Sequence, residues 1–243
     1  MTELKIEELL DMIGRRDVPA IKAYFADQNP IDIAELLSED AELPLAKLYR
    51  LLPKTLAADV FVEMDSDTQA KLIAELSDKE IAETMSELFY DDAADLIEEM
   101  PATVVKRILK NTAPEDRSEI NKLLKFKDDS AGSIMTTEFV ELKREMTVGD
   151  ALDHIRRVAP DKETVYTCYV TDETRHLLGL ITALVLLTSQ TDKRIGDLMD
   201  EHVISVKTSD DREEVAKTLT KYDFLALPVE DSEDRLVGIV TVD

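Results

Sequence analysis

The stretch "LSDKEIAETMSELFYDDAADLIEEMP", residues 76–101, contains two consecutive copies of a twelve-residue unit. Ser77 and Pro101 fall at the same phase of that unit, where a helix cap or a helix breaker is favoured. In one continuous helix, a step of twelve residues would rotate an apolar stripe by about 120° per unit, so no single face would be buried. The stretch therefore predicts short helices joined by tight turns. Its repeated small and apolar positions are Ala82 and Ala94, and Leu76, Leu88 and Met100.

The same step runs through most of residues 1–130, which contain essentially no strand signal. Pro53 and Asp65 continue the series of caps and breakers, and Ser77 with Glu80 forms an S-x-x-E capping box. Alanine recurs at residues 34, 46, 58, 70, 82 and 94, and leucine or methionine at residues 52, 64, 76, 88 and 100. We expect residues 1–130 to form an all-α superhelical array of stacked short helices, whose hand the sequence leaves open.

After "KFKDDSAGSIMT", residues 125–136, the pattern changes to alternating strands and helices. Strand-like runs at 139–143 and 164–170 flank a helical segment, and the same order returns about sixty residues later. Ile134-Met135 matches Leu198-Met199 at an offset of 64, and Gly179 and Thr182 match Gly238 and Thr241 at an offset of 59. This self-similarity predicts a tandem α/β repeat, with one copy at 131–190 and the other at 191–243. The expected helices cover 147–159 and 211–223, and the further strands 203–207, 225–229 and 235–243.

The charge balance excludes one class of partner. The chain has 243 residues and a formal net charge of −24, from 29 basic and 53 acidic residues. Because phosphate backbones require clustered Lys and Arg, we expect no nucleic-acid partner. The charge instead favours cations, basic partners or plain solubility.

The remaining composition is typical of a protein from a reducing compartment. A lone Cys168 excludes an intramolecular disulfide, and its strand-like neighbours favour a small core residue. The first residues form an acidic amphipathic pattern rather than a signal peptide. The longest apolar run, residues 177–189, is too short to span a bilayer, so we expect the polypeptide to be soluble.

No sequence motif favours catalysis. The sequence contains no Ser/His/Asp spacing, P-loop or H-E-x-x-H pattern. Paired acids such as Asp210 and Asp211 suit the N-terminal cap of the helix that follows them. We therefore expect no enzymatic activity.

An acidic stripe occupies one face of the helix expected at 90–101. Asp91, Asp92, Asp95, Glu98 and Glu99 lie opposite the apolar side chains when the segment is wound at 100° per residue. Like charges four residues apart cost a helix a few tenths of a kcal/mol per pair. Asp91 and Asp92 have an ordinary explanation as helix-capping acids, but the other three lie beyond the first turn. Oxygen ligands of this kind suit Mg²⁺, so the stripe is a candidate metal site.

Taken together, these segments resemble a known family. The "SIMT" opening (133–136), the "ALPV" strand (226–229) and two "LhGhhT" strand ends, where h is apolar, resemble a pair of CBS domains. An acidic helical array joined to such a pair through "DSAGSIMT" (129–136) is similar to the cytosolic part of the MgtE-type magnesium transporters. The segment "KYDFLALPVEDSEDRLVGIVTVD" (221–243) adds to the resemblance, which covers nearly the whole chain.

The resemblance implies a Mg²⁺-controlled latch. Its regulatory Mg²⁺ sites would lie between acids of the helical domain and acids of the CBS pair, and bound ions would favour a compact state that closes the pore. The segment at 128–133 would then act as a hinge between the domains. By position, the metal candidates are Asp59, either Asp91 or Asp92, and Asp95 in the helical domain, and Glu213 and Asp223 in the CBS pair.

The resemblance also implies partners and a location. CBS pairs generally form homodimers, and members of the family continue into a transmembrane domain. The chain would then be the regulatory portion of a longer protein, at the cytoplasmic face of the cell membrane, and unable to transport ions by itself.

Two alternative functions stay open. CBS pairs commonly bind ATP or AMP, which would place Thr182, Asp223 and Thr241 at a nucleotide, and the module would then sense adenine nucleotides. Against this, the first repeat has Val185 where the family pattern has a ribose-binding acid. The second alternative is a protein-docking scaffold, because superhelical arrays often bind other proteins.

Overall fold

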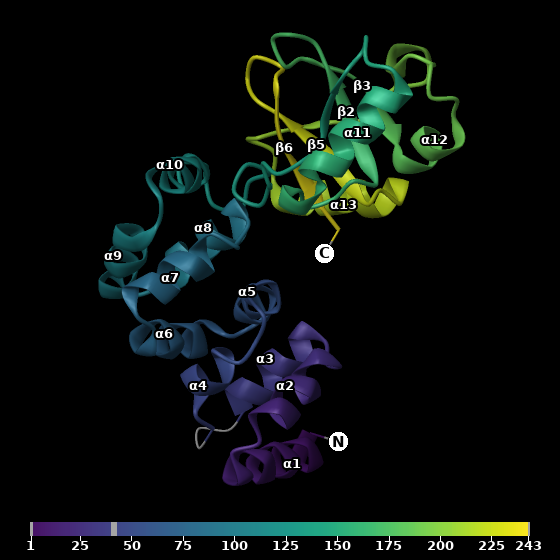
Figure 1. The fold of residues 1–243 in the computed structure, drawn as a ribbon. Helices are drawn as coiled ribbons and strands as arrows, with labels where there is room; N and C mark the ends of the chain where they lie inside the picture. The colour runs from purple at the N-terminus through teal and green to yellow at the C-terminus, as the bar shows by residue number, and fades with distance from the viewer. Residues whose placement is uncertain (1, 40–42, 243) are drawn as a thin grey trace. The chain divides into compact units, whose positions relative to one another are not determined.

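The computed structural model describes residues 2–39 and 43–242 (Figure 1). The chain divides into two compact units. Met1–Leu88 and Asp92–Glu119 form the helical unit, and Phe89–Asp91 and Ile120–Asp243 form the α/β unit. Among the described residues, no helix combines the length and the apolar character that a bilayer span requires. The domain boundaries expected at residues 130 and 190 stay predictions.

Ten short helices are described before the first strand, with eight of them entirely within the helical unit and α8 and α10 shared between the units. They are α1 (Thr2–Arg15), α2 (Val18–Ala26), α3 (Pro30–Glu39), α4 (Leu45–Tyr49), α5 (Lys54–Val62), α6 (Ser66–Glu75), α7 (Asp78–Met85), α8 (Tyr90–Glu99), α9 (Ala102–Asn111) and α10 (Pro114–Leu123).

The helix starts confirm the twelve-residue unit. From α5 to α10 the helices begin at residues 54, 66, 78, 90, 102 and 114, each twelve residues after the last. Local capping explains this phase: the Asp65 carboxylate accepts a hydrogen bond from Thr68 N at 2.8 Å. Ser77 and Glu80 form the predicted capping box, in which Glu80 accepts from Ser77 N at 2.8 Å and Ser77 Oγ accepts from Glu80 N at 3.3 Å.

The apolar phase of the unit forms the core of the helical array. Residues 52, 64, 76, 88 and 100 are all at most 9% exposed. Helix α5 packs against α3 and α7, and α7 packs against α9, so these alternate helices contact one another along the array. Short helices joined by tight turns can bury a common face only in this stacked arrangement.

The α/β unit contains two three-stranded sheets with the same topology. Their strand orders are β1-β2-β3 and β4-β5-β6, and in each sheet the first pair is parallel and the second antiparallel. The first repeat contains β1 (Glu141–Lys143), α11 (Val148–Val158), the 3₁₀ helix η1 (Ala159–Asp161), β2 (Thr167–Thr171), β3 (Leu177–Thr182) and α12 (Ala183–Thr188). The second contains the 3₁₀ helix η2 (Ile195–Asp197), β4 (Val206–Lys207), α13 (Arg212–Tyr222), β5 (Ala226–Glu230) and β6 (Leu236–Thr241). A helical array followed by a tandem α/β pair confirms the predicted fold class.

Each repeat pairs with the segment that opens the other. Thr136, before the first repeat's β1, pairs with Ile239 on β6, and Asp200 pairs with Leu180 on β3. Gly238 is required by this exchange, because a Cβ atom there would lie 2.7 Å from the Thr136 carbonyl oxygen. The two repeats therefore interlock through their backbones.

The expectation of a hinge over 128–133 is wrong for its central residues. Ala131 N donates to the Asp210 carbonyl at 2.7 Å, and Gly132 N donates to the Thr208 carbonyl at 3.0 Å. Ala131 is fully buried. These bonds attach the segment to the strand-to-helix connection before α13, so its backbone is held within the α/β unit.

Candidate metal-binding site

Helix α8 has the two faces that its sequence predicts. Ala93, Leu96 and Ile97 are at most 8% exposed. On the other side, Asp95, Glu98 and Glu99 are exposed, while Asp91 and Asp92 in the first turn are half-buried. The acidic stripe is therefore a real surface of the helix.

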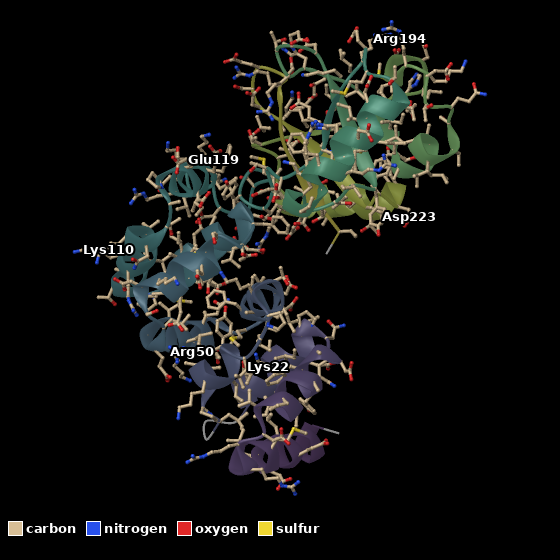
Figure 2. All side chains as sticks on the ribbon, viewed as in Figure 1. Lys22, Arg50, Lys110, Glu119, Arg194 and Asp223 are labelled. Atoms are coloured by element: carbon tan, nitrogen blue, oxygen red, sulfur yellow. The ribbon has the colours of Figure 1, made fainter. Side chains whose placement is uncertain are left out.

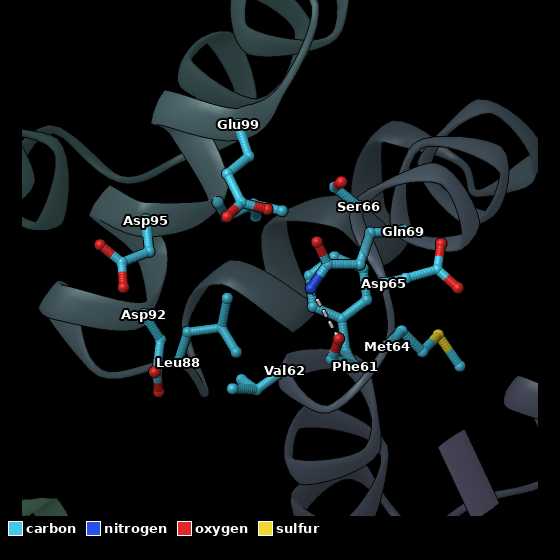
Figure 3. Close-up of a pocket in the computed structure, with 11 residues that line it drawn as sticks. Phe61, Val62, Met64, Asp65, Ser66, Gln69, Leu88, Asp92, Asp95 and Glu99 are labelled. Atoms are coloured by element: carbon cyan, nitrogen blue, oxygen red, sulfur yellow. Dashed lines mark hydrogen bonds between the residues drawn. The ribbon is translucent and has the colours of Figure 1, made fainter. Parts of the chain in front are cut away.

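Part of this stripe lines a cavity of about 280 Å³ within the helical unit (Figure 3). Asp92, Asp95 and Glu99 of α8 and Asp65 and Gln69 at the start of α6 line it. In Figure 3 the Glu99 carboxylate points toward α6, whereas the carboxylates of Asp95 and Asp65 point to opposite sides. Apolar side chains form the rest of the wall: Phe61, Val62, Met64, Leu88 and Leu96. Gln69 is fixed, because its Nε2 donates to the Phe61 carbonyl at 2.9 Å. The cavity is thus an acidic recess with an apolar wall.

Asp65 also lines this cavity, although the sequence predicts for it only a role as a helix cap. Its hydrogen bond from the Thr68 amide lowers the pKa of the carboxyl group, so the carboxylate is charged. Both of its oxygens take part in the cap of α6, because Oδ1 accepts from Thr68 N at 2.8 Å and Oδ2 accepts from Thr68 Oγ1 at 3.0 Å. The capping pattern in the sequence therefore explains Asp65 without predicting that it lines the cavity.

Only some of the four metal candidates of the helical domain line the cavity. Asp92 and Asp95 line the cavity, whereas Asp91 does not. Asp59 is exposed on α5 and also lies outside the cavity wall, and partial desolvation raises the pKa of its carboxyl group. Of the two alternatives at the start of α8, Asp92 is the one that faces the recess.

Glu213 and Asp223 lie at opposite ends of α13 in the α/β unit. Both are exposed, and Asp223 is visible at the surface in Figure 2. Ten residues of helix separate them by about 15 Å, so they cannot both bind one ion directly. Glu213 N donates to Asp211, which caps the helix as predicted. Asp223 closes the helix in the left-handed conformation, with φ at 54°.

Among the residues that the structure describes, no group of three or more His, Cys, Asp or Glu side chains is arranged to hold a metal ion. The carboxylates of the recess nevertheless fit the chemistry of Mg²⁺, which retains several waters and takes one or two carboxylates at a time. The prediction that ions bind between acids of the two domains stays a prediction.

The residues expected at a nucleotide have local structural roles. Thr182 caps α12 by accepting from Val185 N at 3.3 Å, and Thr241 is the last residue of β6. Asp223 lies between Tyr222 and Phe224, whose rings stack with centroids 5.4 Å apart. No sequence motif predicted this aromatic pair, although the Tyr-Asp-Phe pattern directly precedes a strand-like run.

Comparison with known proteins assigns both halves of the chain. Residues 28–129 match the family model of the MgtE intracellular N domain, and residues 131–189 and 195–243 match that of the CBS domain. The magnesium transporter MgtE of Thermus thermophilus is 35% identical over 247 residues, covering 100% of this chain and 55% of that protein. The magnesium transporter MgtE of Enterococcus faecalis is 46% identical over 129 residues, covering 53% of this chain and 28% of that protein.

Two solved structures are similar over almost their whole length. One is the soluble part of a magnesium transporter, with a TM-score of 0.91, 33% identity, and coverage of 100% of this chain and 96% of the other. The second is the cytosolic domain of the Mg²⁺ channel MgtE in complex with ATP, with a TM-score of 0.91, 35% identity, and coverage of 98% and 97%. The chain spans about half the length of the curated relatives that it matches.

Proposed function

Because the chain belongs to the MgtE family of magnesium transporters and corresponds to the cytosolic domain of its members, we propose that it senses Mg²⁺ and gates such a transporter. The acidic recess beside α8 is the observation that supports this proposal most directly. It presents three carboxylates of one helix, together with Asp65, on a protein whose net charge is −24.

The mechanism is electrostatic. Without divalent cations, the acids of the helical unit and those of α13 repel one another and favour an open arrangement of the two units. Mg²⁺ bound to both sets of acids neutralises the repulsion and favours a compact arrangement that closes the pore. Asp59, Asp92 and Asp95 on one unit, with Glu213 and Asp223 on the other, would supply the carboxylates.

Several weak sites together provide the required free energy. Moving a two-state balance from 1:99 to 99:1 requires about 5.5 kcal/mol. An ion that binds the compact state about tenfold better contributes about 1.4 kcal/mol, so about four such ions suffice. Weak and multiple sites also give a response over a narrow range of Mg²⁺ concentration.

The partners follow from the same assignment. The transmembrane domain of the full-length protein receives the signal, and the chain lies at the cytoplasmic face of the membrane. We also propose a homodimer through the α/β units, because Tyr166, Leu184 and Leu187 are 67–71% exposed around α12. Exposed large apolar side chains grouped in this way are typical of protein interfaces.

Small-angle scattering across a Mg²⁺ titration tests the proposed compaction. We expect the radius of gyration to fall as the Mg²⁺ concentration rises from zero, set by a chelator, to millimolar values. Asp95→Asn should raise the Mg²⁺ concentration at which half of this change occurs. Glu35→Gln, an exposed acid on α3 outside the recess, is the matched control. A radius that does not change over the whole titration contradicts the proposal.

A second function, nucleotide binding, is favoured by one observation. A structure 35% identical to this chain is the cytosolic domain of the Mg²⁺ channel MgtE in complex with ATP. In this chain, the stacked Tyr222 and Phe224 rings offer a surface for an adenine base, and Asp223 between them offers an acceptor for a ribose hydroxyl. Calorimetry with ATP and AMP tests this: Phe224→Ala should weaken binding, whereas Tyr24→Ala in the helical unit should not.

A further inference from the structure

The residue that precedes helix α8 has a side chain that cannot cap it. In the twelve-residue series, Asp65 and Ser77 cap the helices that follow them, but the corresponding residue before α8 is Phe89. A phenylalanine side chain has no hydrogen-bond acceptor, so it cannot accept from an amide of the first turn. This first turn contains Asp91 and Asp92, two acids of the stripe.

An acceptor for the first amide of α8 comes from a residue far along the chain. Glu138 Oε1 accepts a hydrogen bond from the amide of Tyr90, the first residue of α8, at 3.3 Å. The two residues are 48 positions apart in the sequence, yet both belong to the α/β unit, which includes Phe89–Asp91. Glu138 therefore acts as the N-terminal cap of α8.

Glu138 is itself held in place on its other side. Its second carboxylate oxygen, Oε2, accepts from Thr136 Oγ1 at 2.9 Å and from Thr137 Oγ1 at 3.3 Å. Thr136 is 2% exposed, and its backbone exchanges two hydrogen bonds of 2.9 Å with Ile239 on β6. A run of hydrogen bonds thus connects β6, through Thr136 and Glu138, to the first amide of α8.

Glu138 differs from the surface acids of the chain in its burial. Its side chain is half-buried, and burial raises the pKa of the carboxyl group, partly offset by the hydrogen bonds from Thr136 and Tyr90. A desolvated acid costs free energy unless its hydrogen bonds compensate. That such an acid occupies this position points to a specific role at the helix terminus.

We propose that Glu138 is a positioning residue that fixes the first turn of α8, and with it Asp92, for the binding of Mg²⁺. The role of Glu138 in Mg²⁺ binding, its metal part, rests on the proposed function. The cap that Glu138 forms on α8 rests on the hydrogen bonds alone. Glu138 does not line the acidic recess, so it acts through α8 and not as a ligand there.

The test uses two substitutions of Glu138 and two readouts. Hydrogen exchange of the Tyr90 amide, followed by NMR on protein labelled with [¹⁵N]tyrosine, reports the cap. The Mg²⁺ midpoint of the scattering titration reports the metal response. Glu138→Ala removes the acceptor, whereas Glu138→Gln keeps a carbonyl oxygen in its place. Glu173→Ala, an exposed acid in the turn after β2, is the control.

We expect Glu138→Ala to speed exchange of the Tyr90 amide about fivefold, because one hydrogen bond is lost. We also expect it to raise the Mg²⁺ midpoint severalfold. Glu138→Gln should restore most of both properties, and the control should alter neither. A general loss of folding would change all six tyrosine amides, whereas loss of the cap changes Tyr90 selectively.

Thr136→Val keeps the charge of Glu138 but removes the hydroxyl that holds it, so it should also speed exchange at Tyr90. Unchanged exchange at Tyr90 in Glu138→Ala would overturn the cap. Faster exchange with an unchanged Mg²⁺ midpoint would overturn the metal part. If the wild-type protein does not respond to Mg²⁺ at all, the proposed function and the metal part both fail, while exchange at Tyr90 still decides the cap.

Discussion

Arg50 and Glu80 form a two-point ion pair between the end of α4 and the first turn of α7. Arg50 Nε lies 2.6 Å from Glu80 Oε1, and Nη2 lies 3.1 Å from Oε2. The same guanidinium donates to the Glu75 carbonyl at the end of α6 at 3.1 Å. Glu80 also completes the capping box of α7. One pair therefore joins three helices of the array.

Glu80→Gln should destabilise the helical unit by about 1 kcal/mol near pH 7, because glutamine keeps an acceptor for the capping box but loses the charge that pairs with Arg50. The Arg50 guanidinium lowers the pKa of Glu80 to about 2. Because the folded-state pKa is depressed, the stabilisation is present above the ordinary pKa and is lost as the pH falls toward about 2. Urea unfolding at several pH values checks this: the difference between wild type and variant should shrink on acidification. A difference independent of pH would contradict it.

Arg107 should be intolerant of replacement by lysine. Its guanidinium donates to the Ile73 and Leu76 carbonyls at the end of α6, and it also contacts Asp78. A single ammonium group cannot satisfy acceptors spread in this way, so Arg107→Lys should cost about 2 kcal/mol. Urea unfolding followed by circular dichroism measures the loss. Lys106→Arg, at the exposed neighbouring position, should be neutral.

Gly238→Ala should destabilise the α/β unit by 2 kcal/mol or more, on the order expected for overpacking against a fixed backbone. The added Cβ would lie 2.7 Å from the Thr136 carbonyl oxygen, inside the bridge that interlocks the repeats. Gly14→Ala is the matched control, because no atom lies within 4 Å of its added Cβ on α1. That change should be neutral or stabilising by up to about 1 kcal/mol. Thermal unfolding of both variants shows whether the loss at Gly238 comes from steric overlap or from replacing a glycine as such.

Local chemistry made the helical array predictable. Asp65 and Ser77 cap the helices that start one residue later, and the acceptor and the donor lie within three residues of each other. The apolar run at 177–189 was less informative, because β3 and α12 follow one another within it. The cap formed by Thr182 marks the boundary between the two elements, whereas the family resemblance implies a nucleotide contact for Thr182 only under the alternative function.

The candidate site was predictable only in part. The acidic face of α8 follows from helical periodicity, so Asp95 was expected at the surface. The recess depends on which helix packs beside α8, so the contribution of Asp65 could not be seen from spacing. Glu138 was invisible for the same reason: its partner Tyr90 is 48 residues away, and no local pattern links a distant carboxylate to a helix start.

A double-mutant cycle on Asp95 and Glu213 tests whether ions bridge the two units. Asp95 lies in the recess of the helical unit, and Glu213 lies in the first turn of α13 in the α/β unit. If one ion binds both carboxylates, either substitution to alanine removes that site and raises the Mg²⁺ midpoint of the scattering titration severalfold. The double variant should then be little worse than either single one, because the second change removes nothing further.

Separate sites give a different result. If each acid binds its own ion, the two effects add, and the double variant shifts the midpoint by the product of the single shifts. Glu35→Ala combined with Glu213→Ala is the control pair, since Glu35 lies outside the recess and should leave the effect of Glu213→Ala unchanged. Additive losses for Asp95 and Glu213 would contradict the bridging ion while leaving Mg²⁺ sensing intact. Less than additive losses, confined to this pair, would identify Asp95 and Glu213 as ligands of the same ion.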